Sequence, residues 1–229
     1  KFLMLWAASF VAAIGSGLTS FGLGVYIFQE TGLAATTGII MLAGFLPGIL
    51  LSPLAGVLAD RYDRRMLMIL GDGLSALGIV YIYYAIANGG ASVTEIAIGV
   101  TISSVFSSLT QPAFNSTISD LLDKDEYSRS SGLTQLTSSA RYLISPLLAG
   151  VLLSVSGIRL ILLLDISTII LTVAVTWLVR KQLVSSPKKE RRSMLEDFKA
   201  GFAIVYNHKG IWSLLLTISL MSFFFGTIQ

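Results

Sequence analysis

Long apolar runs separated by short polar segments dominate this chain of 229 residues. Seven of these runs have about the 20 residues that a helix needs to cross the hydrocarbon core of a bilayer. They cover residues 2–28, 34–59, 66–88, 93–119, 131–155, 160–179 and everything from 211 onward. The pattern predicts an all-α membrane protein with six complete spans and the start of a seventh. Both ends of the chain look truncated.

Composition and charge agree with a lipid environment. Hydrophobic residues make up 54% of the chain and charged residues only 13%, which is more apolar than one soluble core of this length uses. If the spans alternate, all but two of the 16 lysines and arginines fall on one side of the membrane. The positive-inside rule then predicts a cytoplasmic N-terminus. The basic run at 180–192 is explained by topology, so we expect no nucleic-acid partner.

A polar, basic segment divides the chain into three parts. We predict a six-helix transmembrane domain over 1–180, a cytoplasmic linker over 181–209, and the start of a second transmembrane domain over 210–229. Within the linker, Leu195, Phe198, Phe202 and Val205 recur at helical spacing. This spacing indicates an amphipathic helix, which lies either on the membrane surface or against the bundle.

An internal repeat relates the second and fifth spans. Ser52-Pro53-Leu54-Ala55-Gly56 in the second is echoed, with one inserted residue, by the segment 145–150 in the fifth. The same offset along the chain separates Asp72 in the third span from Asp165 in the sixth. Because the second and fifth spans run in opposite directions, the match predicts an inverted three-plus-three repeat, a plan found in secondary transporters.

The loop between the second and third spans carries the most specific motif. It has the form GxxxDRxxRR, and its residues are Gly56, Asp60, Arg61, Asp63, Arg64 and Arg65. The motif resembles the signature loop of the major facilitator superfamily, in which a glycine usually stands at the place of Asp63. The resemblance, which covers essentially the whole chain, is strongest to the branch of macrolide exporters and the enterobactin exporter.

Several expectations follow from this resemblance. The fold would be a major-facilitator-like N-terminal six-helix bundle in a bacterial cell (inner) membrane. The acidic residue and the arginines of the loop would form an interdomain latch that breaks and reforms during alternating access. The fifth span keeps only the proline and one glycine of the GPxxGG-like motif of proton-coupled drug exporters, which weakens the inference of antiport.

Three charged residues lie inside spans, where each costs a few kcal/mol or more and marks a pathway or a pair. They are Asp72, Arg141 and Asp165, and we take them as candidates for binding the substrate or the coupling ion. Arg141 is the strongest of the three, because the superfamily plan places the fifth span beside the central cavity. The two aspartates are either structural or functional.

Small polar residues in the first and fourth spans are candidates for lining a cavity. In the fourth span they recur at steps of three and four along one helical face. The candidates are Ser16, Thr19, Tyr26, Thr101, Ser104, Ser108, Gln111 and Asn115. Each of these side chains serves either the cavity or the packing of helices.

We therefore expect an exporter of small amphiphilic compounds, of the drug, macrolide or siderophore type. The expected coupling ion is the proton, and the missing C-terminal half is expected to be required for activity. The alternatives are a nutrient importer of the same superfamily, the membrane domain of an ATP-driven exporter, and a membrane enzyme or sensor. No GxxxxGK[ST] phosphate loop, cysteine or His pair occurs in the sequence, so we expect no catalytic activity, no cofactor and no metal.

Overall fold

The computed structural model describes residues 2–121, 124–180, 206 and 208–228. The chain divides into two compact units within the segment between residues 180 and 206. The predicted linker and its amphipathic helix lie almost entirely outside the described residues. The two units are therefore treated separately.

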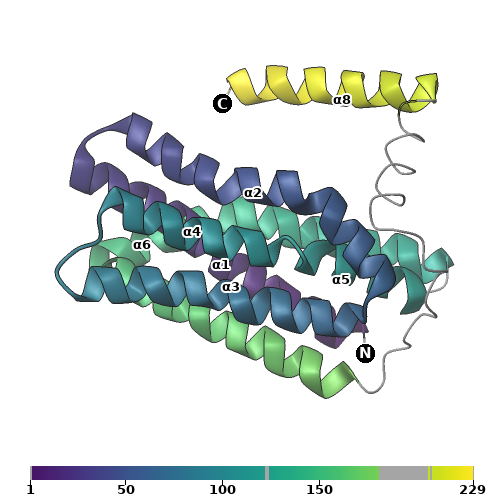
Figure 1. Ribbon diagram of the computed structural model, residues 1–229, viewed down its shortest axis with the longest axis horizontal. Coiled ribbons are helices and arrows are strands. Elements are labelled where there is room, and N and C mark those ends of the chain that lie inside the picture. The colour runs from purple at the N-terminus through teal and green to yellow at the C-terminus, as the bar shows by residue number, and fades with distance from the viewer. Residues whose placement is uncertain (1, 122–123, 181–205, 207, 229) are drawn as a thin grey trace. The chain divides into compact units, whose positions relative to one another are not determined.

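The first unit is a bundle of helices joined by short connections (Figure 1). Its helices are α1 (Phe2–Thr31), α2 (Ala34–Arg61), α3 (Arg64–Ala87), α4 (Val93–Ser107), α5 (Thr110–Leu121) and α6 (Lys124–Val179). Five stretches of this unit are long and apolar enough to cross a membrane, and α4 with α5 forms one of them, Val93–Ile118.

The helix α6 passes along α1 twice, because the backbone turns at Gly157 with φ 70° and ψ −176°. Before this turn, Leu133 O accepts a hydrogen bond of 2.9 Å from Trp6 Nε1. After it, Thr172 Oγ1 donates a hydrogen bond of 3.2 Å to the carbonyl of Ala8. Both contacts lie near the start of α1, so the two halves of α6 are antiparallel and the unit has six passes, as the sequence predicts.

The fourth pass differs from its prediction as one continuous span. The helix is interrupted at residues 108 and 109, between the end of α4 and the start of α5. Pro112 lacks the backbone N–H that would donate to the Ser108 carbonyl in an unbroken helix. The interruption is therefore encoded locally, although hydropathy alone does not reveal it.

Two apolar clusters hold the unit together. The larger one joins α1, α3, α4 and α6 around Leu23, Ile82, Ile96 and Ile161. The smaller one lies where α2 ends and α3 begins and includes Met68 and other fully buried side chains. α1, α3 and α6 contribute to both clusters and connect them.

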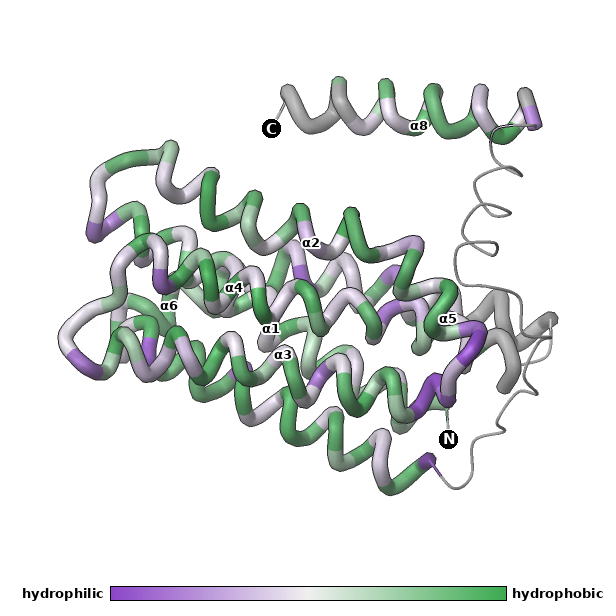
Figure 2. Tube along the Cα trace, in the orientation of Figure 1, coloured by the Kyte–Doolittle hydropathy of each residue, from purple (hydrophilic) through white to green (hydrophobic). Residues whose placement is uncertain are grey.

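Hydrophobic residues recur along every helix of the unit (Figure 2), and many of their large side chains are exposed. Large side chains such as Leu147 and Val155 are 73% and 78% exposed. A continuous surface of this kind needs lipid or another protein domain beside it, because water would leave it unfavourably solvated.

The second described unit contains one apolar helix, α8 (Lys209–Ile228). Its position and length agree with the predicted start of a seventh span.

Candidate functional site

The signature loop is built by the end of α2 and the start of α3. Asp63 is the N-cap residue of α3, and its carboxylate accepts a hydrogen bond of 3.0 Å from the backbone N–H of Arg65. The Arg65 guanidinium also lies 3.7 Å from the Asp63 carboxylate. Aspartate and glycine are both favoured at an N-cap. This position therefore accepts Asp63 in place of the glycine that is usual in the motif.

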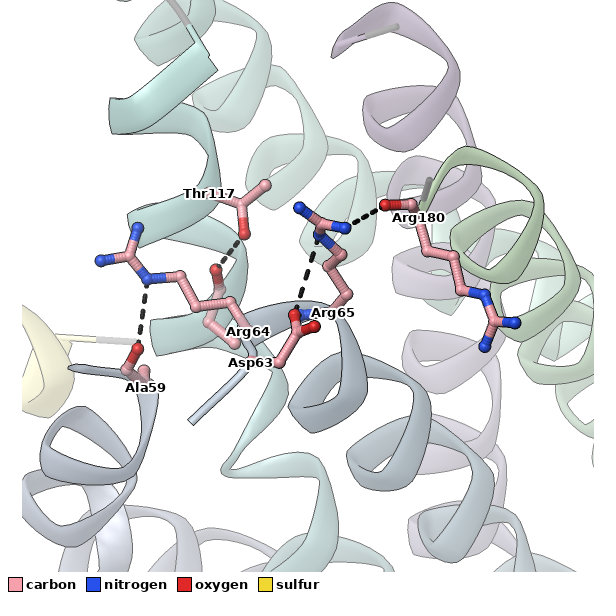
Figure 3. A network of polar contacts seen from close by, with 7 residues as sticks. Ala59, Asp63, Arg64, Arg65, Thr117 and Arg180 are labelled. Atoms are coloured by element: carbon pink, nitrogen blue, oxygen red, sulfur yellow. Dashed lines mark hydrogen bonds and ion pairs between the residues drawn. The ribbon is translucent and has the colours of Figure 1, made fainter. Parts of the chain in front are cut away.

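Two arginines of the loop bind backbone carbonyls at the ends of three helices, and Figure 3 shows the bonds to Ala59 and Arg180. Arg64 Nε donates to the carbonyl of Ala59 at 3.1 Å, and Arg64 Nη1 donates to the carbonyl of Ser116 at 2.8 Å. Arg65 donates to the carbonyl of Arg180, the residue that follows α6. These contacts tie the ends of α2, α5 and α6 together, and we call this part of the first unit the basic end.

The other members of the motif are placed differently. Asp60 is exposed in the last turn of α2, and its side chain makes no hydrogen bond or ion pair with the described residues. Gly56 makes no close helix contact within the described part of the chain, since a Cβ added there would meet nothing within 4 Å. Arg61 is half-buried. Asp60 and Gly56 are thus available to a partner outside this unit.

Asp72 lies in α3 opposite the interruption of the fourth pass. Thr110 Oγ1, in the first turn of α5, donates a hydrogen bond of 2.8 Å to Asp72 Oδ1. The neighbouring Gly71 lets the helices approach, because a Cβ there would lie 2.6 Å from Thr110 Oγ1 and 3.0 Å from the carbonyl oxygen of Phe106. A carboxylate at the start of α5 also complements the partial positive charge of a helix N-terminus.

Asp165 lies in the second half of α6 and is only 2% exposed. It faces α1 at Gly15, where an added Cβ would lie 3.0 Å from Asp165 Oδ1. Asp165 Oδ1 and Thr19 Oγ1 are both buried, and neither has a hydrogen-bond partner among the described residues. The sequence singled out both residues but did not predict that they face each other.

Arg141 lies in the first half of α6 on a different side of α1. A Cβ added to Gly17 of α1 would lie 3.0 Å from Arg141 Cγ, and Ser145, one turn further along, donates a hydrogen bond of 3.2 Å to the carbonyl of Ile14. The Arg141 side chain is exposed and has no hydrogen bond or ion pair within residues 2–180 as described. A guanidinium within a span is costly unless polar groups or water surround it.

The polar stripe of the fourth pass separates into two groups. Ser104 is buried and donates a 2.6 Å hydrogen bond to the Gly44 carbonyl of α2, and Ser108 donates to its own helix at Val105 O, also at 2.6 Å. Gln111 and Asn115 are exposed and bonded to each other at 3.0 Å. Thr101 is half-buried. Ser104 therefore serves packing, whereas Gln111 and Asn115 present amide groups at the surface of the unit.

The candidates on α1 face inward. Ser16 is half-buried and donates to the carbonyl of Ala13 at 3.2 Å. Thr19 is 4% exposed and faces Asp165. Tyr26 is half-buried near the far end of the helix. Gly15 and Gly17 were not among the residues selected from the sequence. Their missing side chains let both halves of α6 approach α1. Small residues at helical spacing, here at 15, 19 and 22, are the signal that identifies a helix face in close contact with another helix.

Six apolar passes with charged residues buried between them define a multi-pass membrane transporter domain. The chain belongs to the Major Facilitator Superfamily, whose sequence profile matches residues 5–229.

The relatives that the chain matches include two named exporters. Macrolide efflux protein A of Streptococcus pyogenes is 28% identical over 235 residues, covering 100% of this chain and 57% of the relative. Enterobactin exporter EntS of Citrobacter koseri is 28% identical over 164 residues, covering 69% of this chain and 38% of the relative. The chain thus spans 57% of the length of the first relative and 38% of the second.

Solved structures share the fold. The crystal structure of peptide transporter POT in complex with sulfate superimposes with a TM-score of 0.70 at 16% identity, over 96% of this chain and 46% of that one. This likeness confirms the predicted major-facilitator fold.

Proposed function

We propose that the full-length protein exports a small amphiphilic compound from a bacterial cell by alternating access, coupled to proton entry. The observation that supports export most strongly is the similarity to macrolide efflux protein A, which extends over the whole chain. The similarity to the enterobactin exporter covers a smaller share of the chain and points in the same direction. The peptide-transporter structures bear on the fold alone.

In this proposal, residues 1–180 form the N-terminal domain and the basic end lies in the cytoplasm of an inner-membrane protein. The basic linker 181–209 leads to a second domain that begins near residue 210. Support comes from the charge distribution of the sequence and from the clustering of Arg64, Arg65 and Arg180 at one end of the unit. Basic residues of this kind stay on the cytoplasmic side of a membrane.

The second domain would close the pathway over the exposed polar side chains of the first. Arg141 is the main candidate for contact with the substrate, because its guanidinium is exposed and makes no hydrogen bond within the described unit. Gln111 and Asn115 add amide donors and acceptors without a fixed charge. Such a lining suits an amphiphilic molecule that carries hydrogen-bonding groups on an apolar framework.

The latch proposal centres on Asp60. Within the described residues, Arg64 and Arg65 are bound to carbonyls of their own unit, whereas Asp60 is exposed and makes no such contact. We therefore assign Asp60 the contact with the second domain and assign the two arginines the task of holding the loop in place.

Drug accumulation in cells tests this function. Cells that express the full-length protein are exposed to a panel of macrolides, fluorescent amphiphilic dyes and catecholate siderophores, with and without a protonophore. Accumulation that is lower than in empty-vector cells, and that the protonophore restores, is the expected result. Higher accumulation of a panel compound than in the control would contradict export and favour the importer. Lower accumulation that the protonophore leaves unchanged would contradict proton coupling.

A further inference from the structure

Asp165 is the most deeply buried acidic group in the described spans. Its side chain is packed between the second half of α6 and α1, where Gly15 provides room for no more than a hydrogen atom. An ionised carboxylate in such a place is costly unless charged partners and hydrogen bonds compensate it, and a neutral carboxylic acid is tolerated far better. The protonation state of Asp165 is therefore linked to how closely α1 and α6 pack.

The internal repeat provides a comparison for this acid. Asp72 and Asp165 occupy matching positions in the third and sixth passes, and each faces a threonine of a neighbouring pass, Thr110 for Asp72 and Thr19 for Asp165. The first pair is joined by a 2.8 Å hydrogen bond. In the second, Thr19 Oγ1 and Asp165 Oδ1 are both buried, and neither has a hydrogen-bond partner among the described residues. The interactions of Asp72 are thus satisfied, whereas Asp165 keeps an open position.

The charged groups around Asp165 are few. The first half of α6 contributes Arg141, whose Cγ packs at Gly17 of α1, two residues from the Gly15 position that Asp165 faces. α1 contributes no charged side chain near Gly15 and Thr19, since its Glu30 lies at the far end beyond Tyr26. α3 also packs on α6, and the acid within its span, Asp72, is bonded to α5.

We propose that Asp165 is the proton-binding site of the first domain, holding a proton while α1 and α6 are packed together and releasing it when they separate enough to admit water. This inference rests on the proposed proton coupling. On release, the O–H bond of the carboxylic acid breaks, the proton passes to water and the electron pair stays on the carboxylate. The nearby Arg141 charge then stabilises the ionised form. Rebinding from the opposite side of the membrane completes the transfer of one proton.

The hydrogen bonding of the two aspartates distinguishes their roles, which the sequence could not do. Asp72 is assigned a structural task at the interruption of the fourth pass, and Asp165 the proton. Asparagine at position 72 can still accept a hydrogen bond from Thr110, so Asp72→Asn is a matched control for Asp165→Asn. Both changes remove one intramembrane acid and conserve side-chain size.

Infrared difference spectroscopy observes the proton directly and needs no substrate. The full-length protein is reconstituted in lipid, and spectra at acid and alkaline pH are compared in the region where protonated carboxylic acids absorb. We expect a titrating band in the wild-type protein and in Asp72→Asn, and its loss in Asp165→Asn. In Thr19→Val the band should persist, because this change leaves the Asp165 carboxyl in place. A band that persists unchanged in Asp165→Asn would overturn the assignment.

A second measurement ties the site to coupling. Vesicles containing each variant are loaded with a pH-sensitive dye, and the compound that gives the largest effect in the accumulation assay is added outside. Proton movement is expected with wild type and Asp72→Asn. Asp165→Asn should lose it while still exchanging labelled for unlabelled compound, which shows that this variant is folded. Two results would overturn the inference. One is proton movement in Asp165→Asn, and the other is the loss of both compound exchange and proton movement in this variant. Exchange without proton movement in the wild type would instead refute the proposed coupling.

Discussion

At the scale of single residues, the signature loop depends on local hydrogen bonding as much as on charge. Asp63 caps α3 through the backbone N–H of Arg65, while Arg64 joins the ends of two other helices. Asp63, which stands where the motif usually has glycine, thus stabilises the start of α3 through a side-chain cap. Asp60, three residues before this cap, is exposed at the end of α2.

The cap leads to a prediction about stability. Asp63→Ala removes the acceptor for the Arg65 N–H and should lower the free energy of unfolding by about 1 kcal/mol, whereas Asp63→Gly should cost only about a few tenths of a kcal/mol. Thermal unfolding of the purified full-length protein in detergent measures both variants. Equal losses in the two variants would show that capping is not the role of Asp63.

At the scale of helices, glycines determine which passes touch. Gly78 of α3 lies against the backbone of α4, where an added Cβ would meet the Gly99 carbonyl and lie 2.7 Å from Ser103 N. Backbone atoms cannot move aside as flexible side chains do. Gly15 and Gly17 let α1 approach side chains of the two halves of α6. The bundle is therefore assembled around a few positions that lack a side chain.

A matched pair of alanine substitutions tests this packing. Gly78→Ala should force α3 and α4 apart and cost about 1–3 kcal/mol, as overpacked sites do. Gly73→Ala, on the same helix, meets nothing within 4 Å and should be close to neutral. Size-exclusion profiles after heating report the two stabilities. A Gly78→Ala protein as heat-resistant as Gly73→Ala would contradict the close approach.

The sequence predicted these helices better than their contacts. Apolar runs near the length of a bilayer crossing identify the passes, and the spacing of Asp72 and Asp165 identifies the repeat. The interruption before Thr110 and the tight turn at Gly157 depend on backbone details that hydropathy averages out. That Thr19 faces Asp165 depends on long-range packing, which no local pattern encodes.

At the scale of the whole molecule, the first described unit is a six-pass domain of a major-facilitator protein. Its outer surface carries large exposed apolar side chains and the exposed Arg141. In the proposed cycle, Asp60 would meet the second domain at the basic end while Asp165 responds to the packing of α1 and α6. The signature loop and the proposed proton site at Asp165 would then respond to the same helix movement, at different depths in the membrane.

The latch can be tested independently of proton binding. Asp60→Ala should reduce transport to the level of empty-vector cells while the amount of protein in the membrane stays unchanged, because the lost contact is needed only between domains. Whole-cell accumulation together with immunoblotting of membranes gives both numbers. An active Asp60→Ala protein would refute the latch.

The central claim, proton-driven export, is tested most directly in inside-out membrane vesicles that contain the full-length protein. A labelled macrolide is added outside and the vesicle interior is made acidic. We expect macrolide uptake into these vesicles. This uptake should stop when an ionophore collapses the pH difference, and it should be absent from vesicles without the protein. Macrolide uptake that depends on the protein but occurs only in right-side-out vesicles would contradict it.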